Sequence, residues 1–374
     1  MDVVIIGAGQ AGLSAAYHLV RRGVARKSGF VVLDADAAPG GAWQHRWPTL
    51  TWERIHGLHP LPDSDAPIAD PQTPAKDVVA PYFAEYERVH ELPVIRPIQV
   101  LRVEEANDTP TQHSPTGPLE PRLLDVVTDR GTWRTQALLN ATGTWTRPYV
   151  PRVPGQAEFS GQQLHTVDYP GPKPFTGEHV VVVGAGRSAV QHLAEISEVA
   201  TTTWVTRHPP QWSDQEFNPE LGRKAVAMVA ERVEAGLPPH SVVSVTGLGL
   251  GPHEEDARTR GVYEHPLPMF DRVVTDGIVW HGPSADGRVP PAHVTAQSIV
   301  YATGFRHALE HLSPLKLRGP QGGIRMSGTE VAADKRIHLL GYGPSASTIG
   351  ATRAGRAAVT AVLRWLSDPA TSSS

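Results

Sequence analysis

One pattern occurs twice in this chain: a short run of β-branched residues leads into a glycine-rich turn, and a helical stretch follows. The first copy begins with Asp2–Ile6 and turns at residues 7–12 (GAGQAG); the second begins with His179–Val183 and turns at residues 184–189 (GAGRSA). Another β-rich run comes after each helical stretch. Each copy is typical of a βαβ unit. The repeated pattern therefore predicts an α/β protein with two such units.

The glycines of the first turn have the spacing of a dinucleotide-binding turn. The first glycine permits the tight bend, the second lets the backbone approach a pyrophosphate, and the third lets helix and strand pack closely. The helix N-terminus then presents its positive end to the phosphates. The next strand ends at Asp34, whose carboxylate suits the hydroxyls of a ribose without a 2′-phosphate, which favours FAD. The candidate FAD-binding residues here are Gly7, Gly9, Gln10, Ala11, Gly12 and Asp34.

The second turn indicates a different dinucleotide. Ala189 replaces the third glycine, a change that this position tolerates. The strand after it ends at Arg207, whose guanidinium suits the 2′-phosphate of NADPH, with His208 beside it. We therefore expect NADPH in the second unit, with NADH also possible. The candidate residues are Gly184, Gly186, Arg187, Ser188, Arg207 and His208.

Two further strands end in the same tripeptide. Ala-Thr-Gly stands at residues 141–143 and again at 302–304, each time after one of the βαβ units. This order predicts two Rossmann-like dinucleotide-binding domains, with the FAD domain split by an inserted NADPH domain. We expect the FAD domain at residues 1–158 and 290–374, and the NAD(P)H domain at 159–289.

Composition and charge exclude several other classes. The 374 residues contain no cysteine, which excludes a redox cysteine pair, a zinc–cysteine site and a thiol nucleophile. The net charge is −4 without a basic run, and no apolar stretch approaches the roughly 20 residues that span a bilayer, so neither nucleic acid nor membrane is an expected partner. The first strand begins at Asp2, which leaves no room for a signal peptide and favours the cytoplasm. No metal site is expected: His307 and His311 lack a third ligand and are interpreted as a polar helix face.

Residues 159–169, residues 40–43 and the two Ala-Thr-Gly strand ends accompany these turns. Together they resemble the flavin-containing monooxygenases, class B flavoprotein monooxygenases, and in particular their small bacterial members. Residues 159–169 (FSGQQLHTVDY) match the family's F-x-G-x-x-x-H-x-x-x-(Y/F) fingerprint, and residues 40–43 (GGAW) resemble its flavin-contacting segment. The fingerprint ends at Tyr169, as in N- and S-oxidising members, where Baeyer–Villiger relatives usually have Trp. The resemblance adds these cofactor-binding candidates: Gly41, Trp43, Thr142, Gly143, Thr303, Gly304, Gly341 and Gly343.

The resemblance implies a mechanism as well as a fold. In the family, NADPH reduces FAD, the reduced flavin captures O2 as a C4a-(hydro)peroxide, and one oxygen passes to a soft nucleophile such as a sulfide or an amine. The flavin carries the chemistry while the protein orients and excludes water. The partners implied are therefore a small-molecule substrate and O2, and a homodimer is the family's usual arrangement. His165 of the fingerprint is expected to organise the linker between the domains.

One departure from the family concerns the catalytic residue. Many members carry an active-site Asn shortly after the G-G-x-W segment, but this chain has no Asn before Asn107. Trp52, Glu53 and His56 lie in that stretch and are the candidates to replace it. Three alternatives remain open: a Baeyer–Villiger monooxygenase acting on ketones, an NADPH oxidase or reductase without productive oxygen transfer, and a sensor that binds both dinucleotides.

Overall fold

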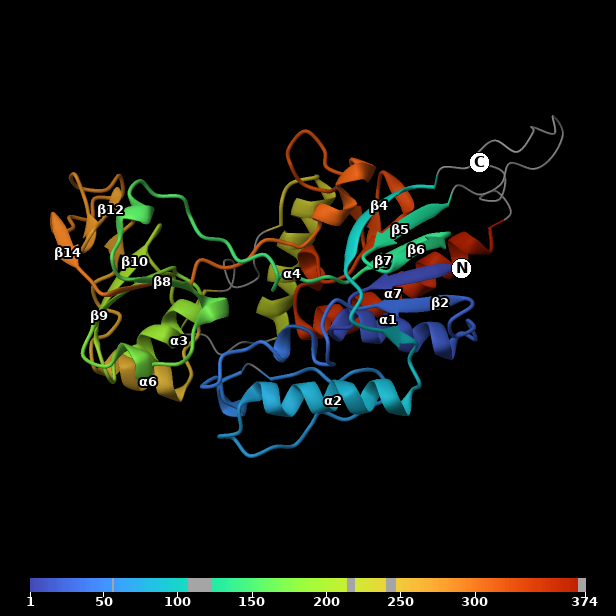
Figure 1. Cartoon of the computed structure of the whole chain (residues 1–374), viewed down its shortest axis with the longest axis horizontal. Helices are drawn as coiled ribbons and strands as arrows, with labels where there is room; N and C mark the ends of the chain where they lie inside the picture. The colour runs from blue at the N-terminus through green and yellow to red at the C-terminus, as the bar shows by residue number, and fades with distance from the viewer. Residues whose placement is uncertain (56, 107–122, 214–218, 240–246, 369–374) are drawn as a thin grey trace.

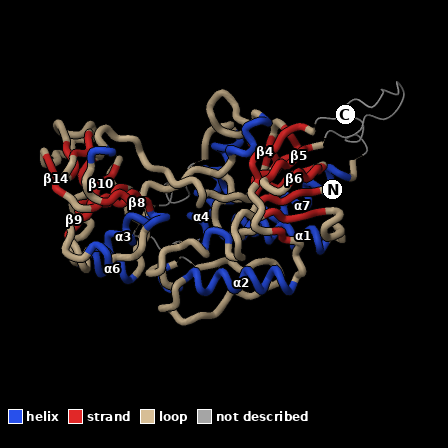
Figure 2. Tube along the Cα trace, viewed as in Figure 1, coloured by secondary structure: helices blue, strands red, loops and turns tan. Residues whose placement is uncertain are grey.

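The computed structural model describes residues 1–55, 57–106, 123–213, 219–239 and 247–368. Figures 1 and 2 show two lobes, each built around a twisted sheet, joined by chain segments that cross between them. The N-terminal strand lies in one lobe, and the second glycine turn lies in the other. Among the described residues, no helix combines the length and the apolar character that crossing a membrane requires.

The first lobe contains a seven-stranded sheet with β1 near its middle. β1 pairs in parallel with β2 on one side and β7 on the other, and β18 continues the sheet beyond β7. The strands follow in the order β16 (Met326–Ser327), β17 (Glu330–Val331), β18 (Asp334–Leu339), β7 (Ala137–Asn140), β1 (Val3–Ile6), β2 (Phe30–Leu33) and β3 (Val94–Ile95).

The alternation of side chains along β1 gives this sheet two buried faces. Val3 and Ile5 belong to a core that includes helices α1 (Gln10–Arg21), α2 (Ala75–Val89) and α7 (Thr348–Leu366). Val4 and Ile6 belong to the core on the opposite face. That face is covered by a small antiparallel sheet and two further elements: β4 (Val100–Glu105), β5 (Leu124–Thr128), β6 (Gly131–Thr135), the 3-10 helix η6 (Glu310–Leu315) and α4 (Pro219–Glu234).

The second lobe repeats this three-layer plan with an all-parallel sheet. Its strand order is β11 (Leu267–Pro268), β10 (Thr201–Thr206), β9 (His179–Val183), β15 (Ser298–Tyr301) and β8 (Gln162–His165). Val180 and Val182 of β9 face α3 (Arg187–Ile196) and α6 (Pro252–Thr259), whereas Val181 and Val183 face the antiparallel sheet of β12 (Arg272–Val274), β13 (Gly277–Val279) and β14 (His293–Thr295). Short 3-10 turns complete the chain: η1 (Gly41–Trp43), η2 (Trp52–Arg54), η3 (Gln156–Glu158), η4 (Thr166–Asp168), η5 (Lys173–Phe175) and η7 (Gly343–Ser345).

The predicted α/β class with two Rossmann-like units is confirmed by these sheets. The exact division into domains stays a prediction. The strands change from the first sheet to the second between β7 and β8, and they change back after β15 at Tyr301. β14 and β15 thus lie in the sheets of the second lobe, although both follow residue 290.

Candidate functional site between the two glycine turns

The two Ala-Thr-Gly strand ends lie side by side in the connection between the lobes. The Tyr149 N–H donates to the Gly304 carbonyl at 2.9 Å, and the Ala308 N–H donates to the Gly143 carbonyl at 3.0 Å. Thr303 donates its hydroxyl to the carbonyl of Tyr149. The segment that leaves the first lobe therefore runs against the segment that returns to it, as the crossing chains of Figure 1 show.

The fingerprint histidine is part of this connection. His165 Nε2 donates to the Gly304 carbonyl at 3.0 Å, and its Nδ1 accepts from the Val167 N–H at 3.3 Å. Its ring meets the Phe305 ring edge to face, with centroids 5.0 Å apart. Burial lowers the pKa of His165, which favours the neutral ring that these two hydrogen bonds require. Both ring nitrogens are engaged within the connection, which supports the expected organising role.

The first glycine turn is shaped by two close approaches and one open position. Gly7 has φ of 98°, and a Cβ there would lie 2.5 Å from the Ala141 carbonyl oxygen. A Cβ on Gly12 would collide with the Gly7 carbonyl, so helix α1 packs directly on the turn. At Gly9, by contrast, a Cβ would meet no atom within 4 Å. The turn thus leaves space beside its middle glycine, at the N-terminus of α1, where a pyrophosphate fits.

Asp34 lies where the sequence predicts, at the end of β2, and is held by two residues that sequence reasoning missed. Its side chain is 9% exposed and accepts from Arg96 Nη2 at 3.1 Å. Arg96 also binds both carboxylate oxygens of Glu87 on α2, at 2.6 and 2.8 Å. Burial raises the pKa of Asp34, and the Arg96 guanidinium opposes this rise. The carboxylate that would bind a ribose is therefore fixed in orientation by an ion-pair network.

The G-G-x-W segment packs directly against the first turn. A Cβ on Gly41, which has φ of 51°, would lie 2.9 Å from the Cα atom of Gly9. Trp43, at the end of η1, packs against the hydrophobic cores of both lobes. This segment therefore lies at the junction of the first turn and the second lobe.

Arg46, which follows this segment, was not among the sequence candidates. Its guanidinium lies 4.5 Å from the ring centroid of Trp145 and 5.5 Å from that of Trp43. Its Nε atom is buried without a hydrogen-bond partner among the described residues. Burial lowers the pKa of Arg46 to about 10, so the group stays charged at neutral pH. A cation that lies over two indoles and has a buried donor without a partner among the described residues is available to an anionic group of a ligand.

Some of the other candidates in the first lobe have space or a polar atom available to a ligand, and others are packed against the protein. Gln10 donates to His59 and Thr352, while its Oε1 atom is buried without a hydrogen-bond partner among the described residues. Gly341 has open space beside its Cα atom, but a Cβ on Gly343 would meet Val233 of α4. Gln10 and Gly341 therefore fit a ligand-facing role better than Gly343 does.

The second glycine turn repeats the geometry of the first. Gly184 has φ of 142°, and a Cβ there would collide with the Ala302 carbonyl. A Cβ on Gly186 would meet no atom within 4 Å. Arg187 begins α3, with Ser188 next to it, and donates from Nη2 to the Gly249 carbonyl at 2.6 Å. Each turn therefore packs against its own Ala-Thr-Gly strand end and leaves open space at its middle glycine.

Arg207 and His208 are exposed at the end of β10, as a 2′-phosphate site requires. Arg288, another residue that the sequence did not indicate, fixes this strand end. It donates to the Thr206 hydroxyl at 2.7 Å and the Thr206 carbonyl at 3.1 Å, and it pairs with Asp286. Arg207 is therefore the guanidinium that faces solvent here, while Arg288 is taken up by the protein.

The three candidates for the missing Asn are not brought together. The Trp52 side chain packs against the first hydrophobic core, and its backbone N–H donates to the Thr73 carbonyl at 2.8 Å. Glu53 is exposed and accepts from Gln72 Nε2 at 2.7 Å. His56 lies outside the described residues. Of the three candidates the structure therefore describes two: Trp52 in the packing of the first lobe and Glu53 at the surface.

The interpretation of His307 and His311 as one helix face is wrong. η6 begins at Glu310, so His307 precedes it, and its ring packs against Tyr342 with centroids 4.7 Å apart. His311 Nε2 donates to Asn140 Oδ1 at 2.7 Å. His311 thus joins η6 to the end of β7, whereas His307 packs on the segment after β18, and burial lowers both pKa values to about 4.

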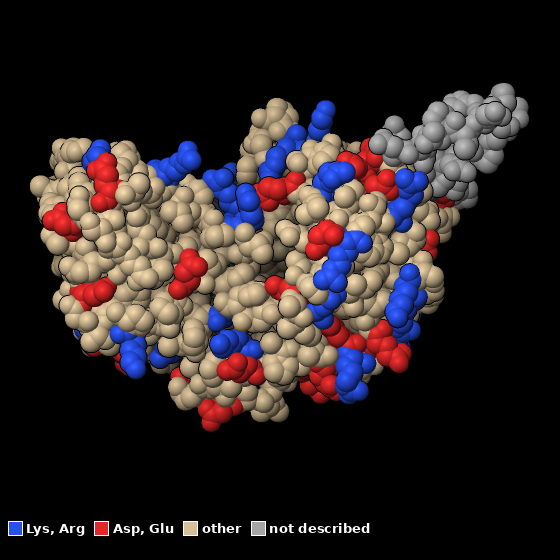
Figure 3. Space-filling model, in the orientation of Figure 1, with Lys and Arg blue, Asp and Glu red and all other residues tan. Residues whose placement is uncertain are grey.

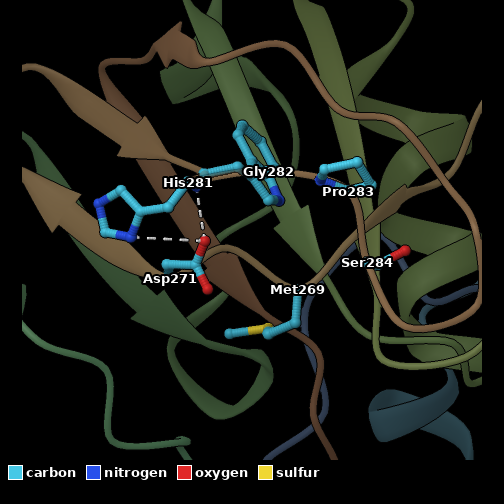
Figure 4. A pocket seen from close by; sticks show the side chains of 7 residues that line it. Met269, Asp271, His281, Gly282, Pro283 and Ser284 are labelled. Atoms are coloured by element: carbon cyan, nitrogen blue, oxygen red, sulfur yellow. Dashed lines mark hydrogen bonds and ion pairs between the residues drawn. The ribbon is translucent and has the colours of Figure 1, made fainter.

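Two cavities lie apart from the glycine turns. One, of about 260 Å³, lies beside the antiparallel sheet of the second lobe, where Asp271 accepts from the His281 N–H at 2.7 Å (Figure 4). The other, of about 400 Å³, lies along η6 between Leu309 and Ile324. Neither is lined by a residue of the two turns. On the face shown in Figure 3, acidic and basic side chains are interspersed, and the surface is recessed where the lobes meet.

Comparisons with known proteins identify the family and the fold of this chain. Residues 4–236 match the family model described as pyridine nucleotide-disulphide oxidoreductase, and the chain belongs to that family. Its fold resembles that of a flavin-containing monooxygenase from Stenotrophomonas maltophilia, with 36% sequence identity and a TM-score of 0.72 over 98% of this chain and 99% of that one. The predicted relationship to the flavin-containing monooxygenases is confirmed. The disulphide of the family's name has no counterpart among these residues, because the chain contains no cysteine.

Curated relatives match only in part. An uncharacterized CzcO-like oxidoreductase from Geobacillus kaustophilus is 29% identical over 53% of this chain and 52% of its own length. The indole-3-pyruvate monooxygenase YUCCA1 of Oryza sativa subsp. japonica is 31% identical over 50% of this chain and 43% of its own length. The chain thus spans about half the length of the curated relatives it matches.

Proposed function

We propose that this protein is an FAD-dependent monooxygenase that uses NADPH and O2 to oxygenate a soft nucleophile, a sulfide or an amine, in a small molecule. One observation carries the proposal. Gly7 packs on the strand end at Ala141 and Gly184 on the strand end at Ala302, and the segments that follow these strand ends are hydrogen-bonded to each other. Two dinucleotides bound at these turns would therefore extend toward one connection between the lobes.

The first lobe fits FAD. The open space at Gly9 and the N-terminus of α1 would hold the pyrophosphate, and Asp34 would accept from the ribose hydroxyls. Arg46 would supply a positive charge near the first turn, and Gln10 a free amide oxygen. FAD, when reduced, supplies the oxygen-activating chemistry, and the chain's own residues bind and orient it.

The second lobe fits NADPH. Gly186 and the N-terminus of α3 would hold the pyrophosphate, and Arg187 lies at the same turn. Arg207 and His208 would bind the 2′-phosphate, which NADH lacks. No cysteine, metal ligand set or catalytic carboxylate is needed for this assignment, because the protein's role is to orient two cofactors and exclude water.

An NADPH oxidase is the second candidate, and one observation favours it. Glu53, the only acid of the stretch that replaces the family's Asn, is turned to the surface and bound by Gln72. With Glu53 held at the surface by Gln72, this acid would not stabilise oxygen activated at the flavin, and more of that oxygen would leave as H2O2. Oxidase and monooxygenase are distinguished by where the oxygen goes.

Rapid mixing tests the proposal. The purified protein with FAD bound is reduced anaerobically by NADPH and mixed with oxygenated buffer. A transient near-ultraviolet absorbance before oxidised flavin returns, shortened by added sulfide with one sulfoxide formed per NADPH, supports the monooxygenase. Shortening by ketones with ester formation would instead identify a Baeyer–Villiger enzyme. Direct return of oxidised flavin with one H2O2 per NADPH would refute oxygen transfer and identify the oxidase.

A further inference from the structure

A buried carboxylate joins the two lobes at a point that the proposed function does not yet use. Glu195, near the end of α3, has a side chain that is 4% exposed. It accepts from three donors: Thr49 Oγ1 at 2.7 Å, Arg54 Nη1 at 2.8 Å and the Tyr169 hydroxyl at 3.0 Å. Thr49 and Arg54 belong to the segment after the first turn's G-G-x-W residues, whereas Glu195 belongs to the second lobe.

The same helix holds the main chain of this segment. Gln191, one turn before Glu195, donates from Nε2 to the Arg54 carbonyl at 3.1 Å. Arg54 is therefore bound through its side chain by Glu195 and through its backbone by Gln191. We call residues 49–54 the latch segment. Its first residue, Thr49, and its last, Arg54, both bind Glu195 of α3.

Aromatic packing surrounds the carboxylate. The ring of His192 lies between Tyr169 and Trp47, with centroid separations of 4.0 and 4.8 Å. Burial lowers the pKa of His192 to about 3, so the ring is neutral at neutral pH. It therefore does not compete with the Arg54 guanidinium as a cation for the Glu195 carboxylate. Trp47 belongs to the hydrophobic core of the second lobe although it precedes the latch segment in the chain. The Glu195–Arg54 ion pair therefore lies in a packed core. An ion pair on the surface would contribute little to stability.

Helix α3 connects the Glu195 contact to the second glycine turn. α3 begins at the second glycine turn, where Arg187 follows Gly186, and Glu195 is two turns further on the same helix. The latch segment carries Trp52, which packs against the core beneath the first turn. One rigid helix therefore touches the nicotinamide-cofactor site at its N-terminus and the flavin-side segment near its C-terminus.

We propose that Glu195 is a positioning residue: through Arg54, Thr49 and Tyr169 it holds the latch segment against α3, so that the two cofactors meet in a fixed geometry. The inference rests on the proposed function, since it assigns FAD to the first lobe and NADPH to the second. Tyr169, the last residue of the fingerprint, contributes its hydroxyl to this contact, whereas phenylalanine would leave one carboxylate bond unmade.

The test compares Glu195→Gln with a matched control. Gln keeps the size of the side chain but removes the charge that binds Arg54. Glu198→Gln, one turn further along, removes a carboxylate that is 49% exposed and lies 3.8 Å from His253. Both proteins are studied with FAD bound, and hydrogen exchange of residues 49–54 is measured without NADPH. We expect exchange in the latch segment to rise at least several-fold in Glu195→Gln only, because local opening becomes easier.

A kinetic measurement completes the test. We expect FAD content and the Kd for NADPH to stay unchanged in Glu195→Gln, while the rate of flavin reduction falls about 10- to 100-fold, since small misplacements of reactants have effects of this size. The double variant Glu195→Gln/Arg54→Met should be no slower than the single one, because both remove the same contact. Tyr169→Phe, which keeps the ring, should show a smaller fall in the rate of flavin reduction. It replaces Glu195→Gln as the test variant if that protein does not fold.

Three results would overturn the inference: unchanged exchange at residues 49–54, equal effects in Glu198→Gln, or additive losses in the double variant. These readouts do not depend on oxygen transfer. A protein whose flavin is reduced by NADPH but returns only H2O2 would refute the monooxygenase proposal and still report whether Glu195 positions the latch segment. A protein that NADPH does not reduce would remove the basis of both.

Discussion

The indole of Trp145 stacks on the phenyl ring of Phe305, with ring centroids 5.2 Å apart. Each residue comes just after one of the two Ala-Thr-Gly strand ends, so the contact joins the exits of both sheets. Arg46 lies over the same indole and connects this stack to the G-G-x-W segment. The site is therefore organised by the connection between the lobes, and the predictions below concern what that connection brings together.

Arg207 should determine the preference for NADPH. In Arg207→Gln we expect kcat/KM for NADPH to fall about 10- to 100-fold, because a charge-assisted hydrogen bond contributes roughly 1.5–3 kcal/mol. NADH, which has no 2′-phosphate, should be oxidised as before. Steady-state kinetics with both coenzymes checks this, with the exposed Arg130→Gln as the control. An equal fall with both coenzymes would show that Arg207 does not read the phosphate.

Substitutions at the middle glycines, Gly9 and Gly186, should impair cofactor binding without preventing folding. A Cβ atom at Gly9 or Gly186 would meet no atom of the described residues within 4 Å, and both residues have extended backbone with negative φ. We expect Gly186→Val to fold and retain FAD but lose reduction by NADPH, and Gly9→Val to fold without FAD. Flavin absorbance, thermal unfolding and anaerobic reduction distinguish these outcomes. FAD retained in Gly9→Val would argue against the first turn as its site.

Arg46 should contribute to FAD binding rather than to folding. Arg46→Met removes a charge available to an anionic group of FAD, and we expect FAD to bind about 10-fold more weakly. The apoprotein should unfold at the same or a higher urea concentration, because a desolvated charge is lost. Arg46→Lys, which keeps the charge, serves as the control. Flavin fluorescence titration gives the Kd, and an unchanged value in Arg46→Met would assign Arg46 to the aromatic packing alone.

His192 should make stability depend on pH. Its pKa is about 3 in the folded protein and about 6.5 in an unfolded chain, so below pH 6.5 the unfolded state binds one more proton. Its contribution to the free energy of unfolding is therefore complete above pH 6.5 and decreases by up to about 1.4 kcal/mol per pH unit as the pH falls toward 3. In His192→Phe this part of the slope should disappear from urea unfolding measured between pH 6 and 5. Other buried histidines, His307 and His311 among them, also contribute to the slope and should leave part of it in His192→Phe. The surface variant His265→Gln should keep the whole slope, and a slope in His192→Phe equal to that of the unmodified protein would contradict the assignment.

Much of the fold was predictable because its signals are local. The strand Val3–Ile6 appears in the sequence as an apolar run before a glycine turn, and the structure buries every residue of it. The strand His179–Val183 has the predicted bounds. Asp34 and Arg207 stand at the ends of their strands, because the end of a strand after a βαβ unit can be counted along the chain.

The residues that sequence reasoning missed act through distant partners. Arg96 is recognisable only once Glu87 and Asp34 lie on either side of it, and Arg288 only once it reaches Thr206. Glu53 was expected near the flavin because of its place after the G-G-x-W segment, yet Gln72 holds it at the surface.

The sequence by itself determined the two glycine turns, their strands and the acid or arginine that follows each, because steric limits on a tight turn and the periods of strand and helix are properties of neighbouring residues. Only the tertiary structure decided that Glu195 meets Arg54, that Arg46 lies over two indoles, and that the two Ala-Thr-Gly segments pair. Such contacts depend on how two lobes pack. The hydrophobic periodicity of the sequence does not predict that packing, because it depends on the burial of surfaces from segments far apart in sequence.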